Sequence, residues 1–361
     1  MDEKRKRIWF SGVGELDAPF NGYKGRWLSV LDFAARDNFK IVTTSYVHSR
    51  QETSYYSYDG KYTIFNCGSY SKKRGYARLR YHWLYMMYFT LYLMRHQKKV
   101  DTIVFNAVPH VNVLGLLCAK LLGKKIILDV RDLWVDVRGN LITRFFARIN
   151  NILFSLQVLG SDKVLVTSRK YIKYIRLRKP IFIPLGFDPC NCEFSVQREN
   201  IIGFIGNESP QYNLIDAIQN LKDLTYSLEF VGNFSEDYQR AIKTANPGVS
   251  IRFVGYLSSE YEKSEIMQRW SFGLIPNLEI SNMGLPTKVF DYLKYRMPIL
   301  YIWKPNTEND IEMLSFIEEG FGILHKDLNA TDNSELSLSI AEKSQKFSRN
   351  ILNEDYLNII L

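Results

Sequence analysis

The chain has 361 residues, of which 46% are hydrophobic and 24% charged, proportions typical of a folded globular protein. This length is sufficient for two domains with their own cores, and the longest apolar run, residues 83–94, is too short to span a bilayer. The net charge of +9 and the pI of about 9.1 favour an anionic partner, and no nucleic-acid-binding module accompanies the basic residues.

The N-terminal residues do not resemble a secretory signal, because the basic residues 4–7 lead into only three apolar residues and then a short polar turn. No CxxC pair or zinc-binding pattern occurs among the four cysteines, which are Cys67, Cys118, Cys190 and Cys192. We therefore expect reduced thiols and a cytoplasmic protein.

Short apolar segments alternate with helical patterns along the chain. The predicted strands of the first half are 8–12, 41–45, 62–67, 102–106, 125–130, 163–167 and 181–184. After a joint at 184–200 the predicted strands are 201–206, 228–232, 251–255, 272–276 and 299–302. This alternation predicts an α/β protein with two Rossmann-like, doubly wound parallel-sheet domains facing across a cleft, with ligands at the carboxyl ends of the strands.

The first predicted strand is followed by Gly12-Val13-Gly14, which must be compared with a dinucleotide-binding fingerprint. The third glycine of G-x-G-x-x-G would fall on Asp17, and the chain has no Walker A loop. These departures argue against NAD as a cofactor.

Residues 70–99 combine cations with aromatic side chains. Lysines and arginines precede the apolar stretch 83–94, and residues 95–99 are again basic. Apolar residues cover nearly all faces of the stretch 83–94, so we expect it to be a buried core helix. We expect the basic, aromatic segment 70–82 to meet an anionic membrane surface. The alternative is a core helix with a solvated basic end.

A site for anionic oxygens is predicted after the strand 272–276. Pro286 can lie in the first turn of a helix, where its missing N–H costs nothing. The N–H groups of that turn and the helix dipole favour anions, Lys288 adds a charge, and Asp291 follows one turn later. A diphosphate with a ribose beside it would suit these groups. The alternative is an ordinary βαβ unit with a solvated Lys–Asp pair.

The sequence GLPTKVFDY at 284–292 resembles the donor-site motif GLPTKVFEY of family-4 glycosyltransferases with the GT-B fold. DVRDLW at 129–134 resembles a DIRDLW segment in members that build bacterial surface polysaccharides. PLGFD at 184–188 is similar to their interdomain linker, and GFIG at 203–206 to the first donor-domain strand. The resemblance runs from about residue 76 to 302.

In the linker, Leu185 replaces the family's usual Asn, and the chain departs from the family in three further places. Asp291 stands where the family usually has Glu, and the family's earlier acidic residue falls on Met283, with Glu279 out of register. The family's phosphate-binding Arg and Lys are absent, and their region holds Asn207, Gln211 and Asn213. More of the phosphate binding is therefore expected from Lys288.

The resemblance implies a set of site residues. Those expected to bind the donor diphosphate and ribose are Gly14, Gly284, Leu285, Pro286, Thr287, Lys288 and Asp291. Those expected to be catalytic or to contact the acceptor are Glu15, Asp17, His110, Arg131 and Asp132, although such residues are often structural. Tyr256 and Leu257 are expected at the base. No D-x-D pair is placed for a metal, and the nucleotide-diphosphate sugar is a co-substrate, so no metal or cofactor is expected.

The expected organisation is an acceptor-side domain at 1–187, a donor domain at 188–334 and a helical segment at 335–361 that returns to the first domain. The expected function is a glycosyltransferase of hexosyltransferase type that uses a UDP- or GDP-linked donor. Its acceptor would be a lipid-linked saccharide in surface polysaccharide synthesis, with a retaining mechanism, at the inner membrane face. Two alternatives stay open: a non-catalytic membrane-associated protein on a degenerate GT-B scaffold, and a GT-B-fold sugar-nucleotide epimerase.

Overall fold

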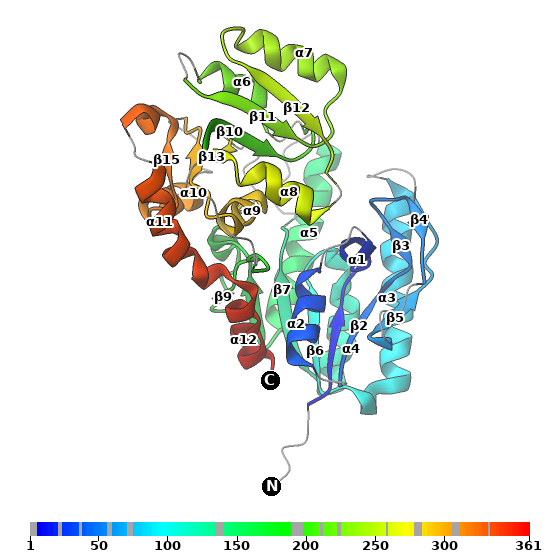
Figure 1. The fold of residues 1–361 in the computed structure, drawn as a ribbon. Helices are drawn as coiled ribbons and strands as arrows, with labels where there is room; N and C mark the ends of the chain where they lie inside the picture. The colour runs from blue at the N-terminus through cyan, green and yellow to red at the C-terminus, as the bar shows by residue number, and fades with distance from the viewer. Residues whose placement is uncertain are drawn as a thin grey trace. The chain divides into compact units, whose positions relative to one another are not determined.

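The chain forms two compact units in a computed structural model (Figure 1). Unit 1 comprises Met1–Pro184 and Asn353–Leu361, and unit 2 comprises Leu185–Leu352. The structure describes residues 6–20, 24–35, 38–55, 60–70, 75–133, 141–189, 198–209, 212–221, 225–257, 259–277, 284–304, 311–330 and 333–361. The units change at Pro184, three residues before the predicted end of the first domain.

Unit 1 is built on a parallel sheet of seven strands in the order β5-β2-β1-β6-β7-β8-β9. Its strands are β1 (Ile8–Ser11), β2 (Phe39–Thr44), β5 (Tyr62–Phe65), β6 (Thr102–Asn106), β7 (Lys125–Val130), β8 (Lys163–Val166) and β9 (Ile181–Phe182). A separate antiparallel pair joins β3 (Tyr46–Val47) and β4 (Glu52–Thr53). Strand β1 is buried along its whole length, and β6 and β7 are buried except for one end residue each, as expected for a sheet with helices on both faces.

The helices of unit 1 are α1 (Asp17–Phe20), α2 (Arg26–Ala34), α3 (Tyr76–His96), α4 (Val113–Leu121), α5 (Leu141–Gly160) and most of α12 (Arg349–Ile360). Helix α4 contacts both α3 and α5, and the three share one apolar core with the sheet. Tyr85 and Phe89 of α3, Leu116 of α4 and Phe154 of α5 belong to this core. The three helices therefore form one layer on the same face of the sheet.

The prediction that residues 83–94 are buried is wrong for half of this helix. Tyr85, Phe89 and Leu93 are buried, whereas Met87 and Leu91 are 55% and 60% exposed. A helix that covers a sheet buries only the face turned toward it, so an all-round apolar sequence leaves its other face exposed.

Unit 2 is built on a parallel sheet of six strands in the order β12-β11-β10-β13-β14-β15. Its strands are β10 (Glu199–Ile205), β11 (Ser227–Val231), β12 (Ile251–Gly255), β13 (Trp270–Ile275), β14 (Ile299–Tyr301) and β15 (Gly322–Leu324). Its helices are α6 (Leu214–Gln219), α7 (Glu236–Ala245), α8 (Glu260–Met267), α9 (Lys288–Lys294), α10 (Ile311–Glu318) and α11 (Asn333–Lys343). Two apolar clusters hold the helices and sheet together.

These two parallel sheets confirm the predicted α/β class. Three strands, β6, β7 and β12, have the predicted bounds, and the others differ by one or two residues at an end. The predictions missed β15 and the β3–β4 pair, which contain only two or three residues per strand. The tail predicted at 335–361 forms two helices, α11 and α12, with a 3₁₀ turn at Ser344–Phe347 between them.

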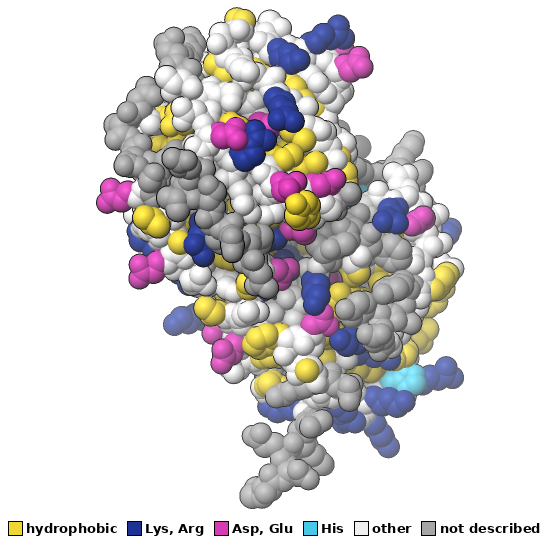
Figure 2. All heavy atoms as spheres, in the orientation of Figure 1, with side chains coloured by type: hydrophobic (Ala, Val, Ile, Leu, Met, Phe, Trp, Pro, Cys, Tyr) yellow, Lys and Arg dark blue, Asp and Glu magenta, His cyan; other side chains and the backbone are white. Residues whose placement is uncertain are grey.

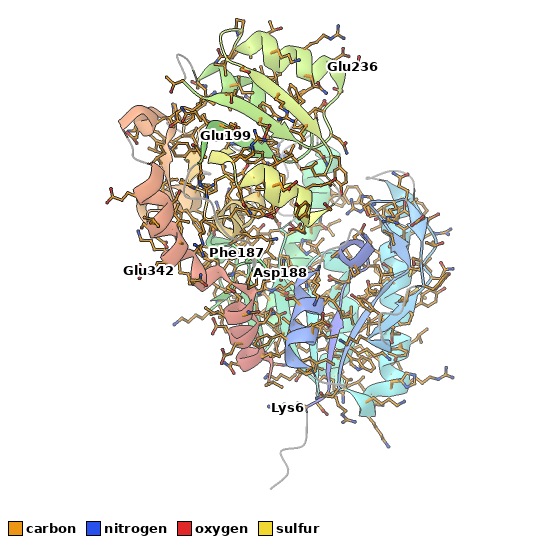
Figure 3. All side chains as sticks on the ribbon, viewed as in Figure 1. Lys6, Phe187, Asp188, Glu199, Glu236 and Glu342 are labelled. Carbon is orange, nitrogen blue, oxygen red and sulfur yellow. The ribbon has the colours of Figure 1, made fainter. Side chains whose placement is uncertain are left out.

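The segment resembling an interdomain linker contacts Phe347 and the first residue of α12. Phe187 N–H donates to Phe347 O at 3.0 Å, and Arg349 Nη1 lies 3.0 Å from Asp188 Oδ2; Phe187 and Asp188 are marked in Figure 3. Gly186 has a φ of 66°, and a Cβ atom there would lie 2.5 Å from Phe347 O. This close approach explains the glycine.

Candidate functional site

In each sheet the strand order reverses once, between β1 and β6 in unit 1 and between β10 and β13 in unit 2. Ligands of doubly wound sheets bind outside the carboxyl ends of the strands at such a point. The glycine-rich loop follows β1, and the turn that holds Lys288 follows β13. Both stretches singled out in the sequence therefore lie at a reversal point.

Lys288 lies inside unit 2 although its side chain ends in a charge. The residue is 5% exposed, and Nζ has no hydrogen-bond partner among the described residues. Nζ lies 3.7 Å from the ring centroid of Phe204 and 3.6 Å from that of Tyr212. Burial lowers the pKa of Lys288 well below its usual value, and the Asp291 carboxylate offsets only part of this. Aromatic faces attract the ammonium but carry no charge, so an anion at Nζ would be strongly stabilised.

Two glycines shape the backbone next to Lys288. Gly206 follows β10 with a φ of 143°, and a Cβ atom there would lie 3.1 Å from Lys288 Nζ. Gly232 follows β11 with a φ of 141°, and a Cβ atom there would lie 2.1 Å from Gly206 O. Both positions need glycine, for its conformation and for the close approach. Nζ is therefore bordered on this side by backbone.

The turn before α9 differs from its prediction. Pro286 precedes the helix instead of lying in its first turn, and Thr287 is the N-cap residue. The N–H groups of Val289 and Phe290 donate to Pro286 O and Thr287 O, at 3.0 and 2.9 Å. These 3₁₀-type bonds satisfy two N–H groups of the first turn. The anion binding predicted for the backbone of this turn is therefore left to the N–H groups of Thr287 and Lys288. The two residues leading into this turn, both half-buried, are Gly284 and Leu285.

Asp291 lies one turn after Lys288, and its side chain is exposed. Desolvation by the surrounding protein raises its pKa, and the nearby Glu260 carboxylate raises it further. Glu260 begins α8 and forms ion pairs with Lys263, at 3.1 Å, and with Lys294. The structure thus places a second carboxylate near the residue predicted to bind a ribose.

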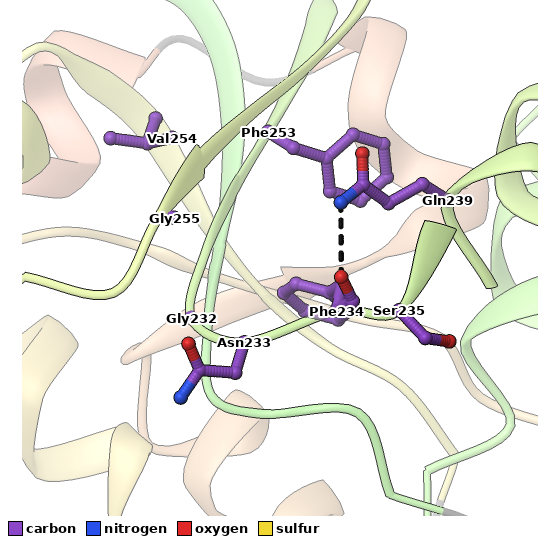
Figure 4. Close-up of a pocket in the computed structure, with 8 residues that line it drawn as sticks. All are labelled: Gly232, Asn233, Phe234, Ser235, Gln239, Phe253, Val254 and Gly255. Atoms are coloured by element: carbon purple, nitrogen blue, oxygen red, sulfur yellow. Dashed lines mark hydrogen bonds between the residues drawn. The ribbon is translucent and has the colours of Figure 1, made fainter. Parts of the chain in front are cut away.

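Tyr256 and Leu257 follow β12 directly. Tyr256 is exposed, and Leu257 packs against a core cluster of unit 2. An open cavity of about 480 Å³ lies at the carboxyl ends of β11 and β12, and its lining includes Gly255, the residue that precedes Tyr256 (Figure 4). The rings of Phe234 and Phe253 form part of its wall, and it reaches Gly232, whose backbone touches that of Gly206. Aromatic walls next to polar backbone suit a flat heterocyclic ring.

In unit 1 a cluster of charged side chains lies at the carboxyl ends of β1 and β7. Arg131 Nε donates to Asp129 Oδ2 at 3.1 Å, and Arg131 Nη1 donates to Glu15 Oε1 at 3.0 Å. The guanidinium also lies over Trp27, 4.0 Å from a ring centroid. Burial raises the pKa of Glu15, an increase that Arg131 limits. Burial acts on Asp129 too, but Arg26 and Arg131 outweigh it and lower the Asp129 pKa.

The last helix, α12, completes this cluster. Tyr356 donates its hydroxyl proton to Asp129 Oδ2 at 3.1 Å and accepts from Trp27 Nε1 at 3.1 Å. Asn353 Nδ2 donates to Ser29 Oγ at 3.0 Å. Because Asp129 accepts bonds from Trp27, Arg131 and Tyr356, it links the end of the chain to α2 and to the segment after β7.

The remaining residues predicted in unit 1 lie outside this cluster. Gly14 has a φ of 79°, and its N–H donates to Thr44 Oγ1 at 3.3 Å. Asp17 accepts from the N–H groups of His48 and Ser49, at 3.1 and 2.7 Å, so it anchors the loop after β3. Asp132 is exposed and makes no hydrogen bond or ion pair with another described side chain.

His110 is buried beneath α5 and is not part of the cluster. Its Nδ1 lies 3.0 Å from Ala107 O, which fixes that nitrogen as the donor, and Nε2 has no partner among the described residues. Burial lowers the pKa of His110 to about 4, so the ring is neutral near pH 7. The ring also packs 5.5 Å from Phe154, which favours a structural role.

Several neighbours of the predicted residues were missed. The two rings around Lys288, the carboxylate of Glu260 and the hydroxyl of Tyr356 come from segments distant in sequence, and no local pattern marks them. Asp129 could have been predicted from the sequence, because it is the first residue of the DVRDLW segment. Some residues of the sequence argument lie outside the described residues: Lys72, Lys73, Arg74, Trp134, Cys190, Cys192, Gln211, Glu279 and Met283.

Within the described residues, no three His, Cys, Asp or Glu side chains are placed to hold a metal ion, and no helix is long and apolar enough to cross a membrane. No protein-family model matches the chain, and no curated protein matches it.

Solved structures match nearly the whole chain. A crystal structure of Anabaena HepE in complex with UDP has a TM-score of 0.67 at 13% identity, covering 98% of this chain and 99% of that one. A second HepE structure contains UDP-glucose and has a TM-score of 0.61 at 13% identity, covering 98% of each chain. The lipopolysaccharide outer core galactosyltransferase WaaB has a TM-score of 0.59 at 12% identity, covering 98% of each chain. These likenesses show the fold, and the predicted GT-B fold is confirmed.

Proposed function

We propose that this GT-B protein is a glycosyltransferase that moves a hexose from a UDP- or GDP-linked donor to a lipid-linked saccharide in surface polysaccharide synthesis. The observation that carries the proposal is Lys288, a buried cation without an anionic partner among the described residues, at the strand-order reversal of unit 2. A diphosphate would supply the missing charge. The fold of HepE, which holds UDP and UDP-glucose in its structures, supports this assignment.

The geometry of unit 2 supports the contacts that we assign. Lys288, with the backbone of the turn at 286–288, binds the diphosphate, and Asp291 binds the ribose hydroxyls with Glu260 nearby. The base lies next to Tyr256, in the cavity lined by Phe234 and Phe253. An anion beside Nζ raises the lowered pKa of Lys288 and so favours its charged form.

In the reaction, the bond between the sugar C1 and the β-phosphate oxygen breaks, C1 forms a bond to an acceptor hydroxyl oxygen, and the hydroxyl proton passes to the departing diphosphate. Negative charge develops on the leaving diphosphate, where the protonated Lys288 stabilises it. We assign a retaining outcome and no metal or cofactor, following the family resemblance. On the acceptor side we assign the contact to Glu15, whose carboxylate Arg131 orients at 3.0 Å, because Asp17 is bonded to backbone.

A thermal-shift screen with UDP, GDP, ADP, CMP and NAD tests the donor site. At a hundred times its dissociation constant a ligand adds about 2.7 kcal/mol to stability. We expect stabilisation by UDP or GDP in the wild type and in Lys346→Ala, whose lysine is half exposed and paired with Glu319, but not in Lys288→Ala. No response to any diphosphate would overturn the proposal and favour a degenerate scaffold.

A further inference from the structure

The layer of α3, α4 and α5 has an outer surface that the core of unit 1 does not use. On α3 the exposed side chains Trp83, Met87, Leu91 and Met94 are spaced by three or four residues, so they form one stripe along the helix. Isolated exposed apolar residues are ordinary, but a continuous stripe on a helix marks a contact surface.

The two neighbouring helices carry matching stripes. On α4 the exposed residues are Leu114, Leu117 and Leu121, and on α5 they include Ile152, Leu156 and Leu159. Because α4 packs between α3 and α5 on one face of the sheet, the three stripes lie side by side. We call this surface the α3–α5 face. Hydrophobic side chains gather along the margin of unit 1 where Figure 1 draws α3, with cations at its lower end (Figure 2).

Charge distinguishes this face from ordinary protein surface. The sequences of α3, α4 and α5 contain no Asp or Glu, although the chain has 38 acidic residues. Exposed arginines lie near the helix ends: Arg80 and Arg95 on α3, and Arg144 and Arg148 on α5. None of these four forms an ion pair with another residue that the structure describes. The face is therefore apolar along its stripes and cationic toward its ends.

We propose that the α3–α5 face docks on the surface of an anionic lipid bilayer, with the apolar stripes in the interface and the arginines at the headgroups. Long cationic side chains can reach headgroup phosphates while their stems cover apolar surface. A second copy of this chain is a poorer occupant, because a two-fold interface would bring the same acid-free cationic surface against itself.

This surface overlaps only in part with the one predicted in the sequence, because Arg80 lies within 70–82 whereas the apolar stripe of α3 begins at Trp83. Within 70–82, Tyr70 is buried against Tyr46 and Tyr81, while residues 71–74 lie outside the described residues. The docking surface is instead the outer side of the helix expected to be core. The inference extends the proposed function, on which it rests for the lipid-linked acceptor.

Co-sedimentation of the full chain with phosphatidylcholine vesicles, with and without phosphatidylglycerol, tests the face. We expect binding to the anionic vesicles that falls roughly tenfold or more in Met87→Glu/Leu91→Glu, because two apolar anchors become charged. Arg95→Gln and Arg148→Gln should each weaken binding about fivefold at low salt, which corresponds to about 1 kcal/mol per cation. The matched control is Tyr261→Glu/Leu338→Glu, two exposed residues of unit 2, which should bind as wild type.

Three results would overturn the proposal: no binding of the wild type, wild-type binding by Met87→Glu/Leu91→Glu, or a wild-type dimer in sedimentation velocity that this variant makes monomeric without any vesicle binding. Equal melting temperatures of variant and wild type establish that the variant is folded. Lys288→Ala separates this inference from the proposed function, because it should lose the nucleotide response and keep vesicle binding. Vesicle binding with no nucleotide response in the wild type would refute the donor site alone.

Discussion

The two units each hold a cation near the point where their strand order reverses, Lys288 buried and Arg131 mostly so, and these cations are in opposite situations. Arg131 is bonded to two carboxylates and stacked on an indole ring. Lys288 faces two aromatic rings and has no hydrogen-bond partner among the described residues. Removing a paired buried cation lowers the stability of the folded state, because its carboxylate partners are left unpaired. An unpaired buried cation itself lowers that stability until an anion binds next to it. The comparison separates a structural cation from a ligand-binding one.

The largest change in stability should come from removing Arg131, the cation that is paired with carboxylates. Arg131→Met should destabilise unit 1 by about 3–5 kcal/mol, because it leaves the Glu15 carboxylate buried without a cation and leaves Asp129 with Arg26 alone, at 3.7 Å. Urea denaturation, with the transitions of the two units fitted separately, measures the change. Arg176→Met, at an exposed arginine of the same unit, is the control and should stay within about 0.5 kcal/mol of wild type. An unchanged Arg131→Met would mean that the cluster is open to solvent.

His110 sharpens the comparison, because one of its ring nitrogens is bonded and the other has no partner among the described residues. Its folded pKa, about 4, lies below an unfolded value of about 6.5, so its contribution is present above that value and is lost as pH falls toward 4. The loss should reach about 2–3 kcal/mol near pH 4.5. Urea denaturation at neutral and acid pH should show a smaller loss in His110→Gln than in wild type. Equal losses in both proteins would contradict a buried neutral imidazole.

Two buried tyrosines test whether the charge of the acceptor matters. Tyr356 donates to the carboxylate of Asp129, and Tyr292 donates to the neutral carbonyl of Leu274 at 3.1 Å. Tyr356→Phe should destabilise unit 1 by about 1.5–3 kcal/mol and Tyr292→Phe unit 2 by about 0.5–1.5 kcal/mol, since hydrogen bonds to charged groups are stronger. The same denaturation measurement compares them. A larger loss for Tyr292→Phe would show that packing, not acceptor charge, decides the cost.

The sequence predicted those parts of the molecule that local patterns encode. Alternating apolar segments located both sheets, and the GLPTKVFDY motif pointed to Lys288 before any geometry was known. Local patterns could not show that Phe204 and Tyr212 enclose that lysine, because strand pairing and side-chain packing bring these segments together. They also could not predict that Tyr356 would reach Asp129, 227 residues away along the chain. The hydrophobic sequence of α3 led to the prediction that both of its faces are buried, whereas only one face of the helix packs against the sheet.

Replacing Lys288, whose Nζ has no hydrogen-bond partner among the described residues, should give the smallest change in stability, with the opposite sign. Lys288→Met should leave unit 2 as stable as wild type or more stable by about 1 kcal/mol, because the apolar thioether replaces a buried charge without removing an ion pair. Its lowered folded pKa lies below an unfolded value of about 10.4, so the penalty is full at pH values below the folded pKa and shrinks as pH rises toward 10.4. Urea denaturation of both proteins between neutral pH and about pH 10 should therefore show the advantage of the variant shrinking. A destabilisation as large as that expected for Arg131→Met would show that the resting protein already pairs this ammonium, and the comparison between the two cations would fail.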